Sequence, residues 1–489
     1  MQVHGLGGLG ARLAAAVRAA RARADAAGQP VLAWTAARIE PIDPVALFRW
    51  AHAGGHNPIL WAQPADGRSL VGLEPAWRFS ASGPQRFALA REAWRALVST
   101  VEPAAVDHAA TEWGGAPVVM GGFAFDADGP VGPQWEGFEA AELVLPRVLA
   151  ATSEAGQYVL ASCVVRPGDP GEEDAGDALA TMALVDDLLR AELACGGQVG
   201  AATAPEGETA AARAAACEEL TPAQTWKALA RDAAEAVRRG ELAKVVVARA
   251  VAVRGVRFDA APILRRLWAD YPTCTLFAVA RGGRCFLGAT PERLAAVRGR
   301  AVRAMGLAGS APRGASEEED RRLGDALLAS TKDRIEHTLV VDVVREALAH
   351  DCTSVWSAPS PSLLKVSNVQ HLHTPIVATP RDGATLLDLV GRLHPTPAVG
   401  GVPRDAALAW LRRHEGLDRG WYAGTVGWID GRGDGEFAVA IRCALLGGRE
   451  AVLFSGCGIV ADSDPEAEYA ESRLKLRPML SALGANGTA

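Results

Sequence analysis

Short apolar runs separated by glycine, proline and aspartate recur along this chain, and they constrain its fold more than any other feature. VLAWTA, ILWA and VGLEPAWRF follow one another between residues 31 and 79, and GGFAFD, LVLPRVLAA and YVLASCVV extend the pattern to residue 165. Runs of this length between turn residues predict antiparallel strands. Because they outnumber the strands that a parallel β-α-β chain needs, we predict an α+β fold with antiparallel sheets.

The composition indicates a globular protein that acts on small molecules. Of the 489 residues, 49% are hydrophobic, which suffices for a large core. A net charge of −7 without any Lys/Arg run argues against a nucleic-acid partner. The eight cysteines lack C-x-x-C spacing, and no apolar run is long enough to span a bilayer. We therefore expect a cytoplasmic protein without a membrane partner, and we interpret residues 12–27, rich in Arg and Ala, as a surface helix.

A change in composition near Leu220 predicts a boundary. A loose segment rich in Gly, Ala and Glu precedes this residue, and Thr221-Pro222 begins a helix that we expect to end near Arg239. The chain is thereby divided into residues 1–220 and residues 221–489.

The stretch GCGIVADSDPEAEYAESRLKLRP, residues 456–478, combines a strand with a charged helix face. Asp464-Pro465 is a helix-start signal, and Glu468, Glu471 and Lys475 then share one face of the helix. A solvated, salt-bridged face is one interpretation of this pattern. The two glycines at 456 and 458 favour another, because they let a ligand approach the backbone closely just before the carboxylates. That arrangement suits a small anion and a divalent metal.

Lys244 stands at the entrance of the predicted strand ELAKVVVARAVAV. Strand alternation places its cation on the same side as Val246 and Ala248. A lysine at a strand end usually extends its ammonium to water. The alternative is a partly buried lysine that works as a base.

Two further carboxylates follow turn and cap signals. FLGATPERL predicts a strand ending in a turn that bears Glu292, and AMGLAGSAPRG predicts another, glycine-rich turn. Ser330 and Asp333 form an S-x-x-D cap for a long helix on which Glu336 shares a face with apolar residues, an unfavourable position without a cation or hydrogen bonds. The apolar positions expected to be buried are Leu339, Val340, Val343 and Leu348.

The sequence also predicts a hairpin around the Gly/Asp turn at residues 430–435, with Arg442 on its second strand. His371 and His373 form an H-x-H pair, but no further ligands accompany them, so we do not predict a metal site there.

As an ordered set, KVVVARA, GATPERL, GLAGSAPRG, STKDRIEH, QHLHTPI, LHPTPAVGG and GCGIVADSDPEAEYAESRLKL resemble the chorismate-utilising enzymes, and among them the isochorismate synthases. The resemblance is dense over residues 221–483 and weaker before them, where GGFAFD carries it. It implies two packed antiparallel sheets with helices outside, in a single large body to which residues 1–220 contribute strands.

The resemblance implies Mg²⁺-dependent isomerisation of chorismate to isochorismate. In it, Lys244 is the general base that activates water for attack at C2, and Glu292 is the general acid that protonates the departing C4 hydroxyl. Glu336 and Glu471 bind the Mg²⁺ cofactor. The residues implied to bind substrate are Gly309, Ser310, His371, Ala398, Arg442, Gly456, Gly458, Glu468 and Lys475.

Other members of the family remain alternatives. The anthranilate and aminodeoxychorismate synthases, which this chain also resembles, use ammonia from a glutamine amidotransferase partner and typically carry glutamine where this chain has Lys244. Lysine therefore favours water, and no glutamine amidotransferase partner is expected. Salicylate synthases share the lysine but also eliminate pyruvate, and they tend to have threonine at the place of Ala398. A silent chorismate-binding relative is a further alternative. The pathway served, menaquinone or siderophore biosynthesis, stays open, as does the oligomeric state, for which a monomer is favoured.

Overall fold

The predicted apolar runs form strands, and every strand pairing in the computed structural model, which describes residues 8–101, 116–169, 176–194, 216–255 and 257–485, is antiparallel. The strands are β1 (Val31–Ile39), β2 (Ile59–Gln63), β3 (Arg68–Ala81), β4 (Val118–Phe123), β5 (Ala141–Ser153), β6 (Gly156–Val165), β7 (Ala216–Glu219), β8 (Lys244–Arg254), β9 (Thr275–Arg281), β10 (Arg284–Thr290), β11 (Arg293–Arg298), β12 (Ala301–Pro312), β13 (Cys352–Ser357), β14 (Ser362–Lys365), β15 (Val369–Pro380), β16 (Gly401–Val402), β17 (Thr425–Asp430), β18 (Gly435–Val439), β19 (Cys443–Gly447) and β20 (Glu450–Ile459). The α-helices are α1 (Leu9–Ala27), α2 (Pro44–Ala53), α3 (Arg86–Val98), α5 (Gly176–Ala194), α7 (Ala223–Arg238), α8 (Ala260–Asp270), α9 (Glu317–Ala329), α10 (Thr331–Asp351), α11 (Leu386–Leu393), α12 (Arg404–His414) and α13 (Pro465–Ala482).

The strand pairings form two arms that meet at β5. One arm runs from β5 through β3, β2, β9, β10, β19 and β20 to β8. The other runs from β5 through β4, β17, β18, β11 and β12 to β15. Both arms therefore contain strands from before and after residue 220, joined at the pairs β2–β9 and β4–β17.

The two arms face each other across the main apolar core. Trp61 on β2 meets Trp428 on β17 edge to face, with ring centroids 5.8 Å apart. Gln63, also on β2, donates a hydrogen bond of 2.8 Å to Glu436 on β18. Cross-arm contacts of this kind are those of two packed antiparallel layers.

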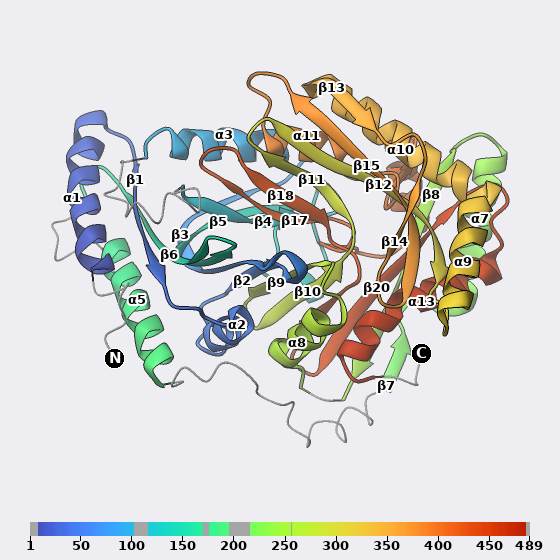
Figure 1. Ribbon diagram of the computed structural model, residues 1–489, viewed down its shortest axis with the longest axis horizontal. Helices are drawn as coiled ribbons and strands as arrows, with labels where there is room; N and C mark the ends of the chain where they lie inside the picture. Colours follow the sequence, from blue (N-terminus) through green and yellow to red (C-terminus); the bar gives the residue numbers. More distant parts are fainter. Residues whose placement is uncertain (1–7, 102–115, 170–175, 195–215, 256, 486–489) are drawn as a thin grey trace.

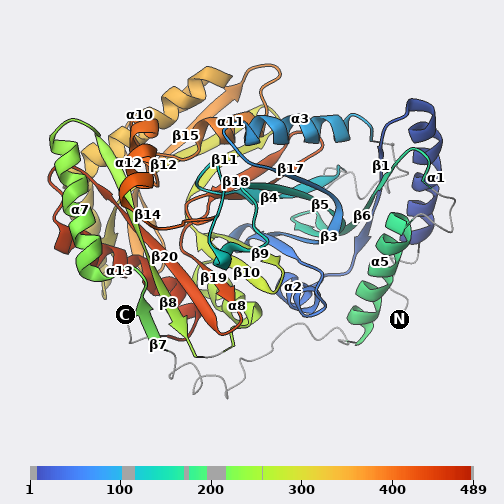
Figure 2. The same cartoon turned by 180° about the vertical axis from the view of Figure 1, so that it is seen from behind.

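Helices cover the outside of these layers. In Figure 1, α1 and α5 lie together at one end of the molecule, beside β1 and β6, and α7, α9 and α13 lie at the other end. Seen from behind in Figure 2, α10, α11 and α3 follow one edge, with α12 below α10. The segment interpreted as a surface helix is α1, whose Leu13 and Val17 side chains are buried. No helix in the described residues is long and apolar enough to cross a membrane.

The structure corrects three local predictions. AMGLAGSAPRG does not form a turn: its residues 304–312 belong to β12, and its glycine at 309 makes an irregularity at φ 76° where the pairing with β15 shifts register. Arg442 does not lie on the second strand of the hairpin, because β18 ends before it and β19 begins after it. On α10, Leu339 and Val343 are only half-buried, since the inward stripe runs through His337, Val340, Val341, Val344 and Leu348.

The loose segment expected before residue 220 lies mostly outside the described residues, and the boundary itself stays a prediction. Just before it, β7 pairs with β8, and just after it α7 begins.

Candidate active site

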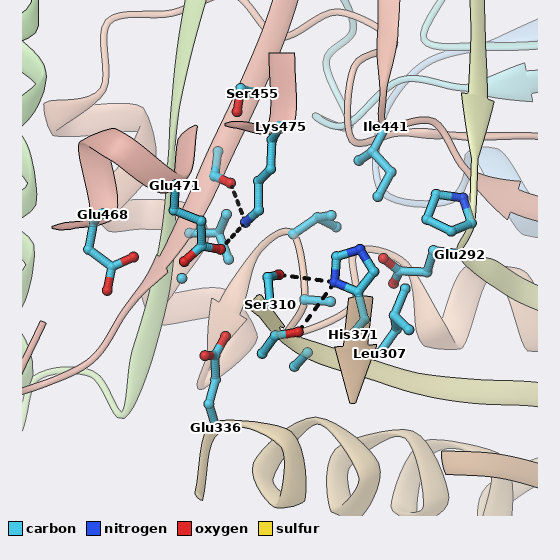
Figure 3. A pocket seen from close by; sticks show the side chains of 18 of the residues that line it. Glu292, Leu307, Ser310, Glu336, His371, Ile441, Ser455, Glu468, Glu471 and Lys475 are labelled. Atoms are coloured by element: carbon cyan, nitrogen blue, oxygen red, sulfur yellow. Dashed lines mark hydrogen bonds and ion pairs between the residues drawn. The ribbon is translucent and has the colours of Figure 1, made fainter. Parts of the chain in front are cut away.

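All the candidate catalytic, metal and substrate residues line one cavity between the two arms. The cavity contains about 800 Å³ of space not filled by protein atoms, part of it open to solvent. Its walls come from β8 and β20 on one arm and from β12 and β15 on the other, with α10 and α13 at one side (Figure 3). The candidate residues brought together are Lys244, Glu292, Gly309, Ser310, Glu336, His371, Ala398, Arg442, Gly456, Gly458, Glu468, Glu471 and Lys475.

The helix-start signals place the carboxylates at the cavity. The side chain of Asp464 accepts a hydrogen bond from the Glu466 amide, so α13 begins where the sequence predicted. Ser330 caps α10 through the Asp333 amide. In Figure 3, Glu336 projects from α10 toward Glu471 and Glu468, which project from α13.

Lys244 is buried against one of these carboxylates. Its Nζ lies 2.8 Å from Oε1 of Glu336, and its side chain is only 1% exposed. The ammonium therefore does not extend to bulk water, although it stands at a strand end. Gly458 leaves room for this pair, because a Cβ atom there would lie 2.6 Å from Cε of Lys244 and 2.7 Å from Oε1 of Glu336.

Each of three cavity carboxylates has its own lysine partner. Besides Lys244 with Glu336, Lys332 lies 2.8 Å from Glu468, and Lys475 lies 2.7 Å from Glu471. Burial and the neighbouring Glu471 charge raise the pKa of Glu468. Against the opposing effect of burial, the Lys475 ammonium lowers the pKa of Glu471.

This donor set fits a hard divalent cation. The carboxylate oxygens of Glu468 and Glu471, both on α13, lie within 4.8 Å of each other, and their mutual repulsion would be relieved by a cation between them. Glu336, on α10, lines the same cavity but lies outside this group of ligand atoms. The Cys457 Sγ lies within 4.8 Å of ligand atoms of both carboxylates, but it is fully buried and contacts the Glu468 carbonyl oxygen. The oxygens are thus the ligands that face the cavity.

Glu292 lies on the opposite wall, in the turn between β10 and β11. Burial raises the pKa of its carboxyl to about 7, although the charges of Lys244 and Arg442 oppose the shift. Thr396 donates a hydrogen bond of 3.4 Å to the Glu292 Oε1 atom. At neutral pH a large fraction of this group is therefore protonated, as a general acid must be.

His371 presents a neutral imidazole. Burial lowers its pKa to about 3, with the Arg442 and Lys475 charges acting in the same direction. Its Nδ1 lies 3.2 Å from the carbonyl oxygen of Gly309 and 3.0 Å from Oγ of Ser310. Because a carbonyl only accepts, Nδ1 carries the proton and Nε2 is an acceptor. This buried Nε2 has no hydrogen-bond partner among the described residues, so it is free to receive a ligand hydroxyl.

Two further cations line the cavity. Lys475 Nζ donates to the carbonyl oxygen of Gly456 at 3.0 Å as well as pairing with Glu471. Arg442 adopts φ 53°, a left-handed conformation uncommon for a residue with a side chain. Within the described part of the chain its guanidinium forms no ion pair, although it lines the cavity. Such a group suits an anionic ligand.

The sequence analysis missed Lys332, Thr396 and Tyr422, which also lie in or beside the cavity. Lys332 precedes Glu336 by one helical turn, and this spacing on a capped helix could have indicated it. Nothing local distinguishes Thr396, whose contact with Glu292 joins residues more than a hundred positions apart.

Comparison with known proteins identifies close relatives along nearly the whole chain. Residues 17–484 match the family model described as Chorismate binding enzyme. The chain is 40% identical over 467 residues to the salicylate biosynthesis isochorismate synthase of Pseudomonas aeruginosa, covering 95% of this chain and 93% of that protein. It is 35% identical over 460 residues to isochorismate synthase MenF of Bacillus subtilis, covering 91% and 92%. The solved structure of MenF, the menaquinone-specific isochorismate synthase from Escherichia coli, has the same fold, with a TM-score of 0.73, 24% identity and coverage of 96% and 100%.

Proposed function

Since this chain belongs to the family of chorismate-binding enzymes, we propose that it is an isochorismate synthase, which adds water at C2 of chorismate and releases the C4 hydroxyl. The observation that carries the proposal is a buried lysine, Lys244, on one wall of the cavity, with a protonatable carboxyl, Glu292, on the other. The proposal is supported by the similarity to relatives named isochorismate synthases, which extends over more than nine-tenths of the chain. The product would serve menaquinone or siderophore biosynthesis.

In this proposal the two proton-transfer groups work on opposite sides of the substrate ring. Lys244, in its neutral amine form, removes a proton from the attacking water, whose oxygen forms the new bond at C2. Glu292 gives its proton to the C4 oxygen as the C–O bond breaks and a water molecule leaves. The ring gains one hydroxyl and loses one, so substrate and product are isomers.

The remaining residues bind and orient. Arg442 and Lys475 would hold the substrate carboxylates, and Nε2 of His371 would accept a hydrogen bond from a substrate hydroxyl. The donor set described above would hold Mg²⁺ through Glu336 and Glu471, with Glu468 beside them, and the bound ion would supply positive charge to a substrate carboxylate. We propose that no glutamine amidotransferase partner is needed.

The test is product analysis by chromatography. Purified protein, chorismate and Mg²⁺ should yield isochorismate without ammonia. Salicylate plus pyruvate as main products would instead favour a salicylate synthase, with Ala398 on the cavity wall as the first position to examine. Anthranilate formed from chorismate and ammonia would reject the assignment.

A further inference from the structure

One edge of β8, the strand that carries Lys244, is paired in an unusual way. At its start, β16 pairs with Lys244 and Val245, and the Val246 amide donates to the Gly400 carbonyl at 2.8 Å. At its end, β7 pairs with residues 251–254. Between β16 and β7, no strand of the described residues pairs with this edge of β8, whose other edge pairs with β20. The segment that follows Pro395 turns instead toward the cavity, which Ala398 and Val399 line.

Two side chains provide hydrogen-bond partners for the backbone of β8 in this gap. Arg419 donates to the Val246 carbonyl at 2.7 Å, and Glu415 accepts from the Ala248 amide at 2.8 Å. These are the backbone groups that a neighbouring strand would otherwise satisfy, and leaving them unpaired inside the protein would be unfavourable. The ion pair thus takes the place of a strand.

The same ion pair also contacts the segment 396–399, part of which lines the cavity. Arg419 donates a second hydrogen bond, of 2.9 Å, to the Val399 carbonyl. Its guanidinium forms a two-pronged contact with Glu415, both distances being 2.6 Å, and stacks 4.2 Å from the ring centre of Phe125. Both side chains are almost fully buried, so the geometry has little freedom to change.

We propose that Glu415 and Arg419 are positioning residues for the reaction, an inference that rests on the proposed function. Their hydrogen bonds join β8 to the segment 396–399 and so set the distance between the two proton-transfer groups, Lys244 and Glu292. Lys244 lies two residues before Val246 on the clamped strand, and Thr396, which hydrogen-bonds Glu292, lies three residues before Val399. Neither member of the pair lines the cavity, so their effect passes through the backbone.

The test compares Arg419→Lys with the same substitution in another buried ion pair. Lysine keeps the charge but cannot bridge both carbonyls and the carboxylate. We expect kcat to fall by about 10- to 100-fold while the KM for chorismate changes by less than about threefold, since small displacements of reacting groups cost rate. The control is Arg281→Lys, which weakens the buried contact of Arg281 with Glu142, a pair that does not line the cavity. It should lower the melting temperature as much and leave kcat within about twofold of the wild type.

Glu415→Gln provides a second variant if Arg419→Lys does not fold. It keeps an acceptor for the Ala248 amide and removes only the charge that orients Arg419, and it should lower kcat in the same way. Glu415→Arg combined with Arg419→Glu would not restore the contacts, because the two side chains bond different backbone groups.

Hydrogen exchange gives a readout independent of turnover. In Arg419→Lys, where Glu415 loses the two-pronged contact that orients it, the Ala248 amide should exchange faster than in the wild type, with no change in β10. If the wild-type protein does not convert chorismate, the proposed function fails, and exchange at Ala248 still decides whether the pair holds β8. Unchanged exchange at Ala248, or a loss of kcat equal to that of Arg281→Lys, would overturn the positioning role.

Discussion

The ammonium of Lys244 and the carboxylate of Glu336 form a buried ion pair of 2.8 Å, between β8 and α10. The proposed base and a proposed metal ligand are thus direct partners. A carboxylate engaged by a metal shares its charge with that metal, so metal loading and the state of the lysine are linked by this contact. The predictions below separate the two residues.

Loss of either proposed metal ligand should abolish turnover while leaving the fold intact. For Glu336→Gln and Glu471→Gln, binding of Mn²⁺, used as a calorimetric probe for Mg²⁺, should weaken by more than the roughly 10- to 100-fold typical of an outer-shell partner. Glu346→Gln on α10 and Glu466→Gln on α13 are matched controls, because both side chains are exposed. Full wild-type activity in EDTA would contradict the metal's role.

Lys244→Ala should lose water addition and keep chorismate binding. Arg442 and Lys475 remain to hold the carboxylates, whereas removal of a general base typically costs about 10²- to 10⁴-fold in rate. Single-turnover rates and equilibrium binding of chorismate would distinguish the two effects. The control is Lys227→Ala, which breaks the ion pair of Lys227 with the exposed Glu466 side chain. Near-normal isochorismate formation by Lys244→Ala would show that another group is the base.

The pH profile should show an alkaline limb that belongs to Glu292. Because burial raises its pKa to about 7 and the acid must be protonated to act, the contribution of Glu292 to the rate should be complete below that pH and fall about tenfold per unit above it. Glu292→Gln should be slow and lack this limb. The measurement is kcat/KM against pH, which reports the groups of the free enzyme, with Glu346→Gln as the variant that keeps the limb. A limb that persists in Glu292→Gln would assign it to a different group of the coupled site.

Gly458→Ala should separate folding from activity. The added methyl group would overlap Cε of Lys244 and Oε1 of Glu336, which are the far ends of flexible side chains, so the ion pair rather than the backbone must move. We expect a folded protein with activity reduced about 100-fold, as misplaced reacting groups produce. Gly447→Ala on β19 is the control, because its nearest neighbouring atom would be 4.0 Å away. Equal activities of the two variants would show that the pair tolerates displacement.

Much of the local structure could be predicted because its causes are local. A side chain at Asp464 or Ser330 caps its own helix, and apolar runs between turn residues form strands wherever they find partners. Glycine content misled the prediction at β12, where pairing with β15 outweighs the flexibility of AMGLAGSAPRG. Arg442 was misplaced for a related reason, since strand alternation cannot show where a ladder of hydrogen bonds ends.

By itself, the sequence determined the antiparallel class, the helix starts and the residue types of the candidate site, all of which follow from spacing along the chain. Only the tertiary structure decided that Lys244 is buried against Glu336, that Glu292 lies in an environment that raises its pKa, and that Glu415 and Arg419 complete the edge of β8. Each of these depends on burial and on contacts between segments far apart in the chain. Desolvation and hydrogen-bond completion act on neighbours in space, and residue spacing does not record who those neighbours are.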